Sequence, residues 1–193
     1  MKMIDLIKDY TERGWHLFPC EPGSKKPAKR NTGERLSYHD AVNKYEPLAK
    51  HFTKRPTDNI GLNLEASGLV CIDVDSYKPD CEFNSFIQGR DLPPTLTQRS
   101  ASGGIHYIFK ASALDQFPGT ICKGVDIKHK GYILLEPSTF NGNKYVWESD
   151  DEPAAIPAWV PRKDDTPLLQ QPQEAPPVMH IDLGSNLGID FNT

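Results

Sequence analysis

Two acids placed two positions apart, Asp73 and Asp75, are the residues of this 193-residue chain that most directly suggest chemistry. They close the apolar, β-branched run LVCIDVD, which predicts a strand. Side chains at i and i+2 of a strand share one face, about 7 Å apart, so both carboxylates would project together while Ile72 and Val74 face the core. A divalent cation with oxygen ligands would relieve their repulsion. The alternative interpretation is an acidic turn at the end of a strand.

A third acid, Asp126, lies between Val125 and Ile127 in the segment GVDIKHKG. This alternation predicts a strand whose acid lies on the face opposite the core. Together with Asp73 and Asp75 it would complete a carboxylate site for two metal ions, the arrangement that stabilises the attacking and leaving oxygens in phosphoryl transfer. Taken alone, Asp126 is better interpreted as a surface acid.

The segment SASGGIHYIFK joins a glycine turn to a histidine. Gly103 and Gly104 permit a tight turn in which backbone N–H groups approach a phosphate closely. His106 begins the next predicted strand and could donate a hydrogen bond to a triphosphate oxygen, with Ser102 or Arg99 assisting. The alternative is a simple hairpin that happens to contain a histidine.

Four basic residues occur close together in PGSKKPAKR, namely Lys25, Lys26, Lys29 and Arg30. A basic loop of this kind suits contact with a template backbone or a nucleotide phosphate. A solvated surface loop is the alternative.

Helical patterns that could position these residues occur mainly in the first half of the chain. Apolar residues at helical spacing from Met3 to Tyr10 predict a first helix that stops at Gly14. Ser37 and Asp40 resemble a capping box for a second helix, which Pro47 must kink or end. A short third helix is predicted around residues 83–87.

Strand patterns dominate the second half. The segments WHLFP, LVCIDVD, TLTQRS, IHYIFK, VDIKH, YILLEP and KYVWE are short, rich in β-branched and aromatic residues, and separated by Gly, Asn or Pro turns. Helices early and strands late predict an α+β fold with a largely antiparallel or mixed sheet.

Composition divides the chain near residue 160, because seven of the 17 prolines lie between Pro153 and Pro177. We expect one folded domain over residues 1–160 and a Pro-rich linker or tail over 161–193, either disordered or leading into a further region. The net charge of −4 argues against bulk coating of nucleic acid but permits a local basic groove. No apolar run could span a bilayer, and four dispersed cysteines fit reduced thiols.

Four segments, taken in order, resemble the bifunctional primase/polymerase N-terminal domain, a branch of the archaeo-eukaryotic primase superfamily. They are GWHLFPCEPGSKKP, NIGLNLEASGLVCIDVD, LPPTLTQRSASGGIHYIF and GVDIKHKGYILLEPSTFNGNKYVWE, and the resemblance runs from about residue 5 to residue 150. It implies an RRM-like mixed or antiparallel sheet that bears the active site, packed with a smaller N-terminal α/β unit.

The resemblance also implies roles for individual residues. Asp73 and Asp75 match the first motif of the family and Asp126 the third, so these three acids are expected to be catalytic and to hold two Mg²⁺ or Mn²⁺ ions. His106 matches the histidine of the second motif, which contacts the phosphates of the incoming nucleotide. The further residues expected at the nucleotide are Ser102, Gly103, Gly104, Arg99, Lys25, Lys26 and Lys128.

The implied function is template-directed nucleotidyl transfer by a DNA primase/polymerase. Its partners would be a single-stranded DNA template, a primer terminus and NTP or dNTP, with no membrane involved. The resemblance implies a prokaryotic cytoplasm and a plasmid, phage or mobile-element replication system. No Walker-type helicase motif follows, so a helicase is expected in the same longer chain or in trans.

Two other functions are alternatives for this sequence. A replication initiator that nicks DNA through a tyrosine needs two histidines flanking one apolar residue, and Gly104-Ile105-His106 lacks the first. A non-catalytic module could use the same sheet to bind single-stranded DNA or an origin. The three acids argue against this second alternative, because a pure binder gains nothing from clustered negative charge.

Overall fold

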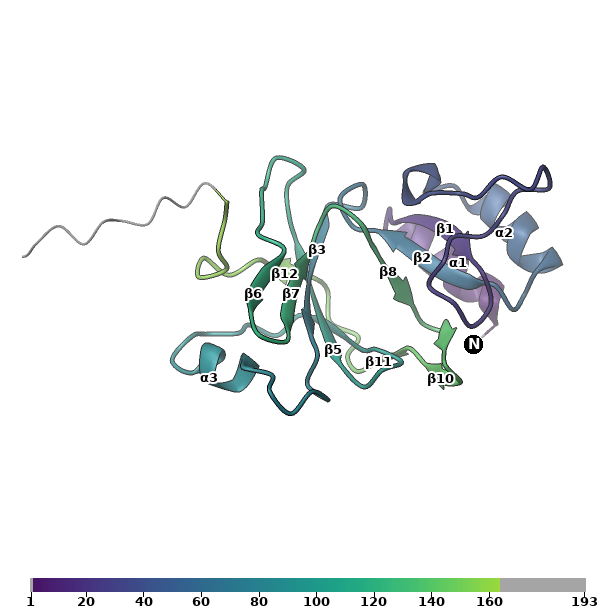
Figure 1. The fold of residues 1–193 in the computed structure, drawn as a ribbon. Helices are drawn as coiled ribbons and strands as arrows, with labels where there is room; N and C mark the ends of the chain where they lie inside the picture. Colours follow the sequence, from purple (N-terminus) through teal and green to yellow (C-terminus); the bar gives the residue numbers. More distant parts are fainter. Residues whose placement is uncertain (1, 164–193) are drawn as a thin grey trace, which may run out of the picture.

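The computed structural model describes residues 2–163, which form two antiparallel sheets side by side (Figure 1). The smaller sheet has the order β1-β2-β8, and the larger has the order β11-β4-β5-β3-β7-β6, with β12 added in parallel beside β5. The prediction of an α+β fold with a mixed, largely antiparallel sheet is confirmed, while its RRM-like character stays a prediction. Most of the predicted tail, from residue 164 onward, lies outside the described residues, and the domain boundary near residue 160 stays a prediction.

The smaller unit combines the start of the chain with one later strand. Its elements are α1 (Met3–Glu12), β1 (His16–Cys20), the 3-10 helix η1 (Tyr38–Asp40), α2 (Tyr45–Lys54), β2 (Asn59–Asn63) and β8 (Tyr132–Leu135). The family resemblance implies a smaller unit that is N-terminal. Since the later strand β8 pairs with β2, this unit is not purely N-terminal.

The larger unit contains the remaining elements. They are β3 (Leu69–Val74), α3 (Phe83–Ile87), β4 (Leu96–Arg99), β5 (Ile105–Lys110), β6 (Thr120–Cys122), β7 (Val125–Lys128), β11 (Val146–Trp147) and β12 (Ala154–Ala155). A separate hairpin is formed by β9 (Thr139–Phe140) and β10 (Asn143–Lys144). Among residues 2–163, no helix is long and apolar enough to cross a membrane.

The first helix forms as its sequence predicts. Leu6, Ile7 and Tyr10 form its buried face, and Gly14 follows with a positive φ of 78° that favours glycine. The predicted second helix was wrong in position. Ser37 and Asp40 do form a capping box, but only around η1, and α2 begins at residue 45.

Pro47 neither kinks nor ends α2. It lies in the first turn of that helix, where backbone N–H groups have no partner within the helix and the missing N–H of proline therefore costs little.

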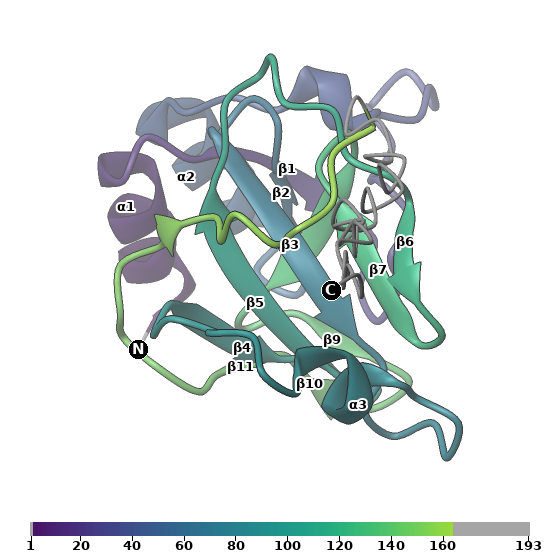
Figure 2. The same cartoon turned by 90° about the vertical axis from the view of Figure 1, so that its left-hand side faces the viewer.

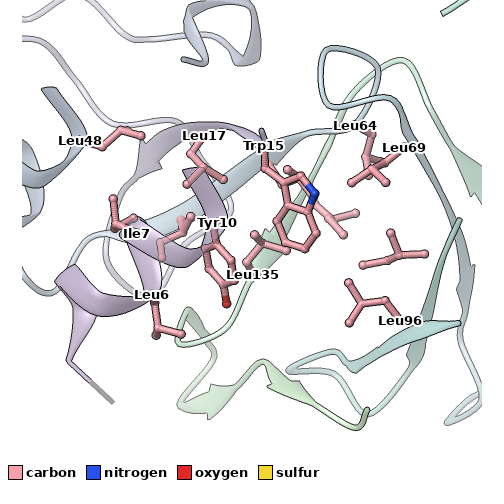
Figure 3. Packing of buried hydrophobic residues seen from close by; sticks show 14 of the residues in the cluster. Leu6, Ile7, Tyr10, Trp15, Leu17, Leu48, Leu64, Leu69, Leu96 and Leu135 are labelled. Atoms are coloured by element: carbon pink, nitrogen blue, oxygen red, sulfur yellow. The ribbon is translucent and has the colours of Figure 1, made fainter. Parts of the chain in front are cut away.

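One apolar core joins the two units (Figure 3). Leu6 and Leu17 of the smaller unit belong to the same buried cluster as Leu69 and Leu96 of the larger sheet, with Trp15 in the cluster as well. Because strands of both sheets contribute residues to this cluster, one side of the larger sheet faces the smaller unit. We call this side of the larger sheet its inner side.

The outer side of the larger sheet is covered too. Val70, Ile72 and Phe109 form a second cluster there with Val160, from the segment after β12 that crosses this side in Figure 2. All six residues of β3 are therefore buried. Asp73 therefore does not project into open solvent, and the residue is only 9% exposed.

All four cysteines are free, as predicted, and two of them are buried. Burial raises the pKa of Cys20 to about 12 and holds that of Cys71 well above its ordinary value. We expect iodoacetamide at pH 8 to modify only the half-buried Cys81 and Cys122 in the native protein, because the thiolate is the reactive form. Peptide mapping by mass spectrometry tests this, with denatured protein as the control in which all four react. Native labelling of Cys71 as fast as Cys81 would contradict the fold.

Candidate active site

Five polar residues lie side by side across the inner face of the larger sheet. The strand register places Gln98 opposite His106, His106 opposite Asp73, Asp73 opposite Asp126 and Asp126 opposite Thr120. We call these five residues the polar row. Its members come from β4, β5, β3, β7 and β6, so the pairing of five strands assembles it.

Asp73 is the centre of the row and is surrounded by cationic or donor groups. Its Oδ1 lies 3.4 Å from Nε2 of His106, and its Oδ2 pairs with the ammonium of Lys128, which lies two residues after Asp126 on β7. Burial favours the neutral acid, but the hydrogen bond from His106 and the charge of Lys128 outweigh it and hold the pKa of Asp73 well below its usual range. Asp73 therefore stays ionised although it is nearly buried.

Gln98 fixes how His106 presents its ring. The Gln98 side chain is fully buried, donates from Nε2 to the carbonyl of Leu134 (2.9 Å) and accepts from the backbone N–H of Glu136 (3.0 Å). These bonds orient its amide so that Nε2 also faces Nδ1 of His106, 3.2 Å away. Nδ1 must then accept, and the ring presents Nε2–H toward Asp73.

The three predicted acids are not equally placed. Asp73 and Asp126 are direct cross-strand neighbours, and Thr120 Oγ1 donates to Asp126 (3.1 Å). Asp75 follows β3 immediately, but its carboxylate pairs with Lys78 at 2.6 Å. Two carboxylates and a histidine thus lie in one row. The third carboxylate, that of Asp75, lies two residues after Asp73, just beyond the end of β3.

The glycine turn holds His106 next to Asp73. Residues 100–104 close the β4–β5 hairpin through a bond from Ser100 N–H to Gly104 carbonyl (2.8 Å), and Gly103 has a positive φ of 92°. At Gly104 a Cβ atom would lie 2.7 Å from the carbonyl oxygen of Val74. The absence of a side chain at this position therefore lets the hairpin pack against the end of β3.

We expect Gly104→Ala to destabilise the protein by about 1–3 kcal/mol, since backbone atoms must move to accept the methyl group. Urea unfolding followed by tryptophan fluorescence measures the change. Gly119→Ala is the matched control, because a Cβ there would meet nothing within 4 Å. Equal stability of the two variants would contradict the close approach.

The other predicted nucleotide-binding residues are less close to the row. Ser102 is exposed in the glycine turn that precedes β5, the strand that carries His106. Arg99 pairs with Glu148 (3.1 Å), and strand alternation turns it to the face opposite Gln98. Lys25 lies over the ring of Phe140, 4.9 Å from its centroid, and the neighbouring Lys26 is exposed.

Among the predicted nucleotide-binding residues, Lys128 makes the most direct contact with the polar row, through Asp73. The sequence did not indicate Gln98 as a residue of the site. The segment TLTQRS predicted the strand that carries Gln98, but nothing in its spacing indicates a partner on β5. The pairing arises from the hairpin register, which two-residue alternation alone does not supply.

The donor chemistry of the row suits a hard divalent cation, because carboxylate oxygens are the ligands that Mg²⁺ and Mn²⁺ prefer. The side chains of residues 2–163 include no ready group of three or more acids, histidines or cysteines that could hold a metal. Lysines lie on two of the acids instead: Lys128 on Asp73 and Lys78 on Asp75. A cation would have to replace these ammonium groups as the counter-charge.

The family model of the bifunctional DNA primase/polymerase N-terminal domain matches residues 7–159. The chain therefore belongs to this family. Membership gives it a DNA primase/polymerase role, with DNA and nucleotides as its substrates. No curated protein sequence matches it.

Proposed function

We propose that the chain is a template-directed nucleotidyltransferase whose active centre is the polar row with Asp75 and Lys128. The observation that carries this proposal is the strand register that places Asp73 directly between Asp126 and His106, in a chain of the primase/polymerase family. The oxygen of a 3′-hydroxyl attacks the α-phosphorus of a nucleoside triphosphate and loses its proton to water. The bond between the α-phosphorus and the oxygen that bridges to the β-phosphorus breaks, and pyrophosphate leaves.

The acids and the donors have separate tasks in this reaction. Asp73, Asp126 and Asp75 would hold two Mg²⁺ or Mn²⁺ ions, which when bound lower the pKa of the attacking hydroxyl and neutralise the leaving group. The Nε2–H of His106, whose ring Gln98 holds, faces Asp73 at 3.4 Å and would become available to a triphosphate oxygen once a cation takes over the Asp73 carboxylate. Lys128, released from Asp73, supplies a second donor with a fixed positive charge.

The test is incorporation of a labelled nucleotide on single-stranded DNA, with and without an annealed primer, in Mg²⁺ or Mn²⁺. The proposal expects extension only by the nucleotide complementary to the template. Products without a primer would add primase activity. Incorporation that ignores the template base would contradict the assignment.

One observation favours a second candidate, a single-stranded DNA or origin-binding module without chemistry. The described residues contain no ready metal-binding group of three, and lysines neutralise two of the acids. DNA binding together with no metal-dependent incorporation under any of the conditions above would support this candidate.

The setting of the activity is proposed from the family resemblance. We propose a replication system of a plasmid, phage or other mobile element, acting in a prokaryotic cytoplasm. A helicase, in the same longer chain or in trans, would supply the single-stranded template. Stimulation of extension on duplex DNA by an added helicase tests this partnership.

A further inference from the structure

A pocket of about 440 Å³ opens on the helical side of the smaller unit, away from the polar row. Its wall on one side is the end of the basic loop, with Lys29 and Arg30, and on the other side α2, with Lys50, Lys54 and Arg55. None of its lining residues belongs to the polar row. The basic loop that the sequence singled out thus meets a second basic segment from α2.

The pocket is strongly positive although the chain is acidic. Five cationic residues line it, in a chain whose net charge is −4; Asp40 and Glu34 pair with Arg30 and Asp58 pairs with Arg55, so the uncompensated positive charge is that of the three lysines. Arg30 pairs with Asp40 at 2.5 Å. No ion-pair partner is found for Lys29, Lys50 or Lys54 among residues 2–163. Three exposed ammonium groups are therefore available for an anion.

A buried acid holds part of this surface in place. Asp58, 1% exposed, contacts Nε2 of His51 (2.8 Å) and Nε of Arg55 (2.9 Å) through its Oδ2. An arginine held through Nε presents its two terminal nitrogens outward, a geometry that suits a phosphate. Lys50 and Lys54, one helical turn apart, lie about 5–6 Å from each other at Cβ, which allows contact with adjacent phosphates of one strand.

The floor of the pocket indicates which phosphate ligand fits. It is aliphatic, formed by Leu17, Pro19, Leu36, Val42 and Leu48, and no Phe, Tyr or Trp lines the pocket. The aromatic ring in the lining, that of His51, is held by the buried Asp58 (2.8 Å), so contact falls to the sugar–phosphate backbone, which is recognised independently of sequence.

We propose that this basic pocket binds the backbone of a single nucleic-acid strand, outside the catalytic centre. The inference rests on the proposed function in taking that strand to be the template. It adds a second contact point that anchors the strand to the smaller unit while the polar row acts on the primer end.

The test is binding of a fluorescein-labelled single-stranded oligonucleotide, measured by anisotropy over a range of salt without metal or nucleotide. In the triple variant Lys29→Gln, Lys50→Gln, Lys54→Gln we expect at least tenfold weaker binding at low salt. The slope of log affinity against log salt should fall in magnitude by about 2, since each lost contact with a single strand removes roughly 0.7. Oligonucleotides of different sequence should give the same losses.

The matched control is Lys8→Gln, Lys110→Gln, Lys130→Gln, which removes the same charge from exposed lysines outside the pocket. Equal weakening by both triple variants would overturn the proposal, because bulk charge would then explain the binding. If the Lys29, Lys50, Lys54 variant lost binding of labelled ATP but bound the oligonucleotide like wild type, the proposal would also be overturned, since the pocket would then hold a free nucleotide. Because this binding is measured without metal or nucleotide, it does not depend on the proposed reaction, so failure of that reaction is distinguishable from failure of this inference.

Discussion

Asp73→Asn is expected to lower the rate of primer extension by at least about a thousandfold, the largest effect of any single substitution in the chain. Asp73 lies between His106 and Asp126 in the centre of the polar row, and its pKa is held well below the usual range. Asparagine keeps the shape of the side chain but removes the negative charge that would hold a divalent cation. Single-nucleotide extension of an annealed primer at saturating DNA and Mn²⁺ measures the change.

A matched substitution controls for loss of charge in general. Asp80→Asn removes an exposed acid that pairs with Lys123, and this variant should extend the primer like wild type. Since Asp73→Asn leaves Lys128 without its partner, circular dichroism and oligonucleotide binding should establish that the variant is folded. A folded Asp73→Asn protein with more than a tenth of wild-type activity would contradict the assigned centre.

His106→Ala is expected to raise the KM for the incoming nucleotide roughly 10–100-fold, with a smaller effect on the affinity for DNA. A hydrogen bond to a charged group contributes about 1.5–3 kcal/mol, and the Nε2–H of His106 is the donor that Gln98 orients toward the centre. Steady-state extension at varied nucleotide concentration separates KM from kcat.

The control for this substitution is His39→Ala, which removes an exposed histidine of the smaller unit. An unchanged nucleotide KM in His106→Ala would mean that the histidine serves only the packing of the sheet. A rise in KM reproduced by His39→Ala would equally contradict a specific role for His106.

Local patterns predicted the elements that bear the site. The alternation around Asp126 gives a strand with Val125 and Ile127 buried and the acid on the other face, as observed. The helix from residue 3 and its stop at Gly14 follow from the spacing of a few apolar residues and one glycine. In these segments the secondary structure that the local sequence favours is also the one that buries its apolar residues. A short stretch of sequence is therefore enough to predict each element.

The arrangement of the site could not be predicted from such windows. Asp73 is nearly buried because β3 is covered on both sides, by the smaller unit and by the segment that ends at Val160. The bonds of Gln98 with His106 and of Lys128 with Asp73 depend on which strands become neighbours. That choice involves residues far apart in the sequence, and a one-residue change of register would separate each pair.

The basic loop gives a similar lesson about distance. Its four cations looked like one group in the sequence, but Lys25 lies over Phe140 while Lys29 joins α2 at the pocket. An isolated antiparallel β-bridge between the backbones of Cys20 and Pro27 folds the loop back along β1. Lys25 precedes this β-bridge and Lys29 follows it. Only the folded chain shows that Lys50 and Lys54 belong with Lys29.

The most direct test of the central claim is single-nucleotide extension of a primed DNA template by wild type and by the double variant Asp73→Asn, Asp126→Asn. Both proteins should be assayed at equal DNA occupancy in saturating Mn²⁺. Template-directed extension by the wild type and none above background by the folded double variant is the predicted result. Comparable extension by the two proteins would contradict the polar row as the active centre.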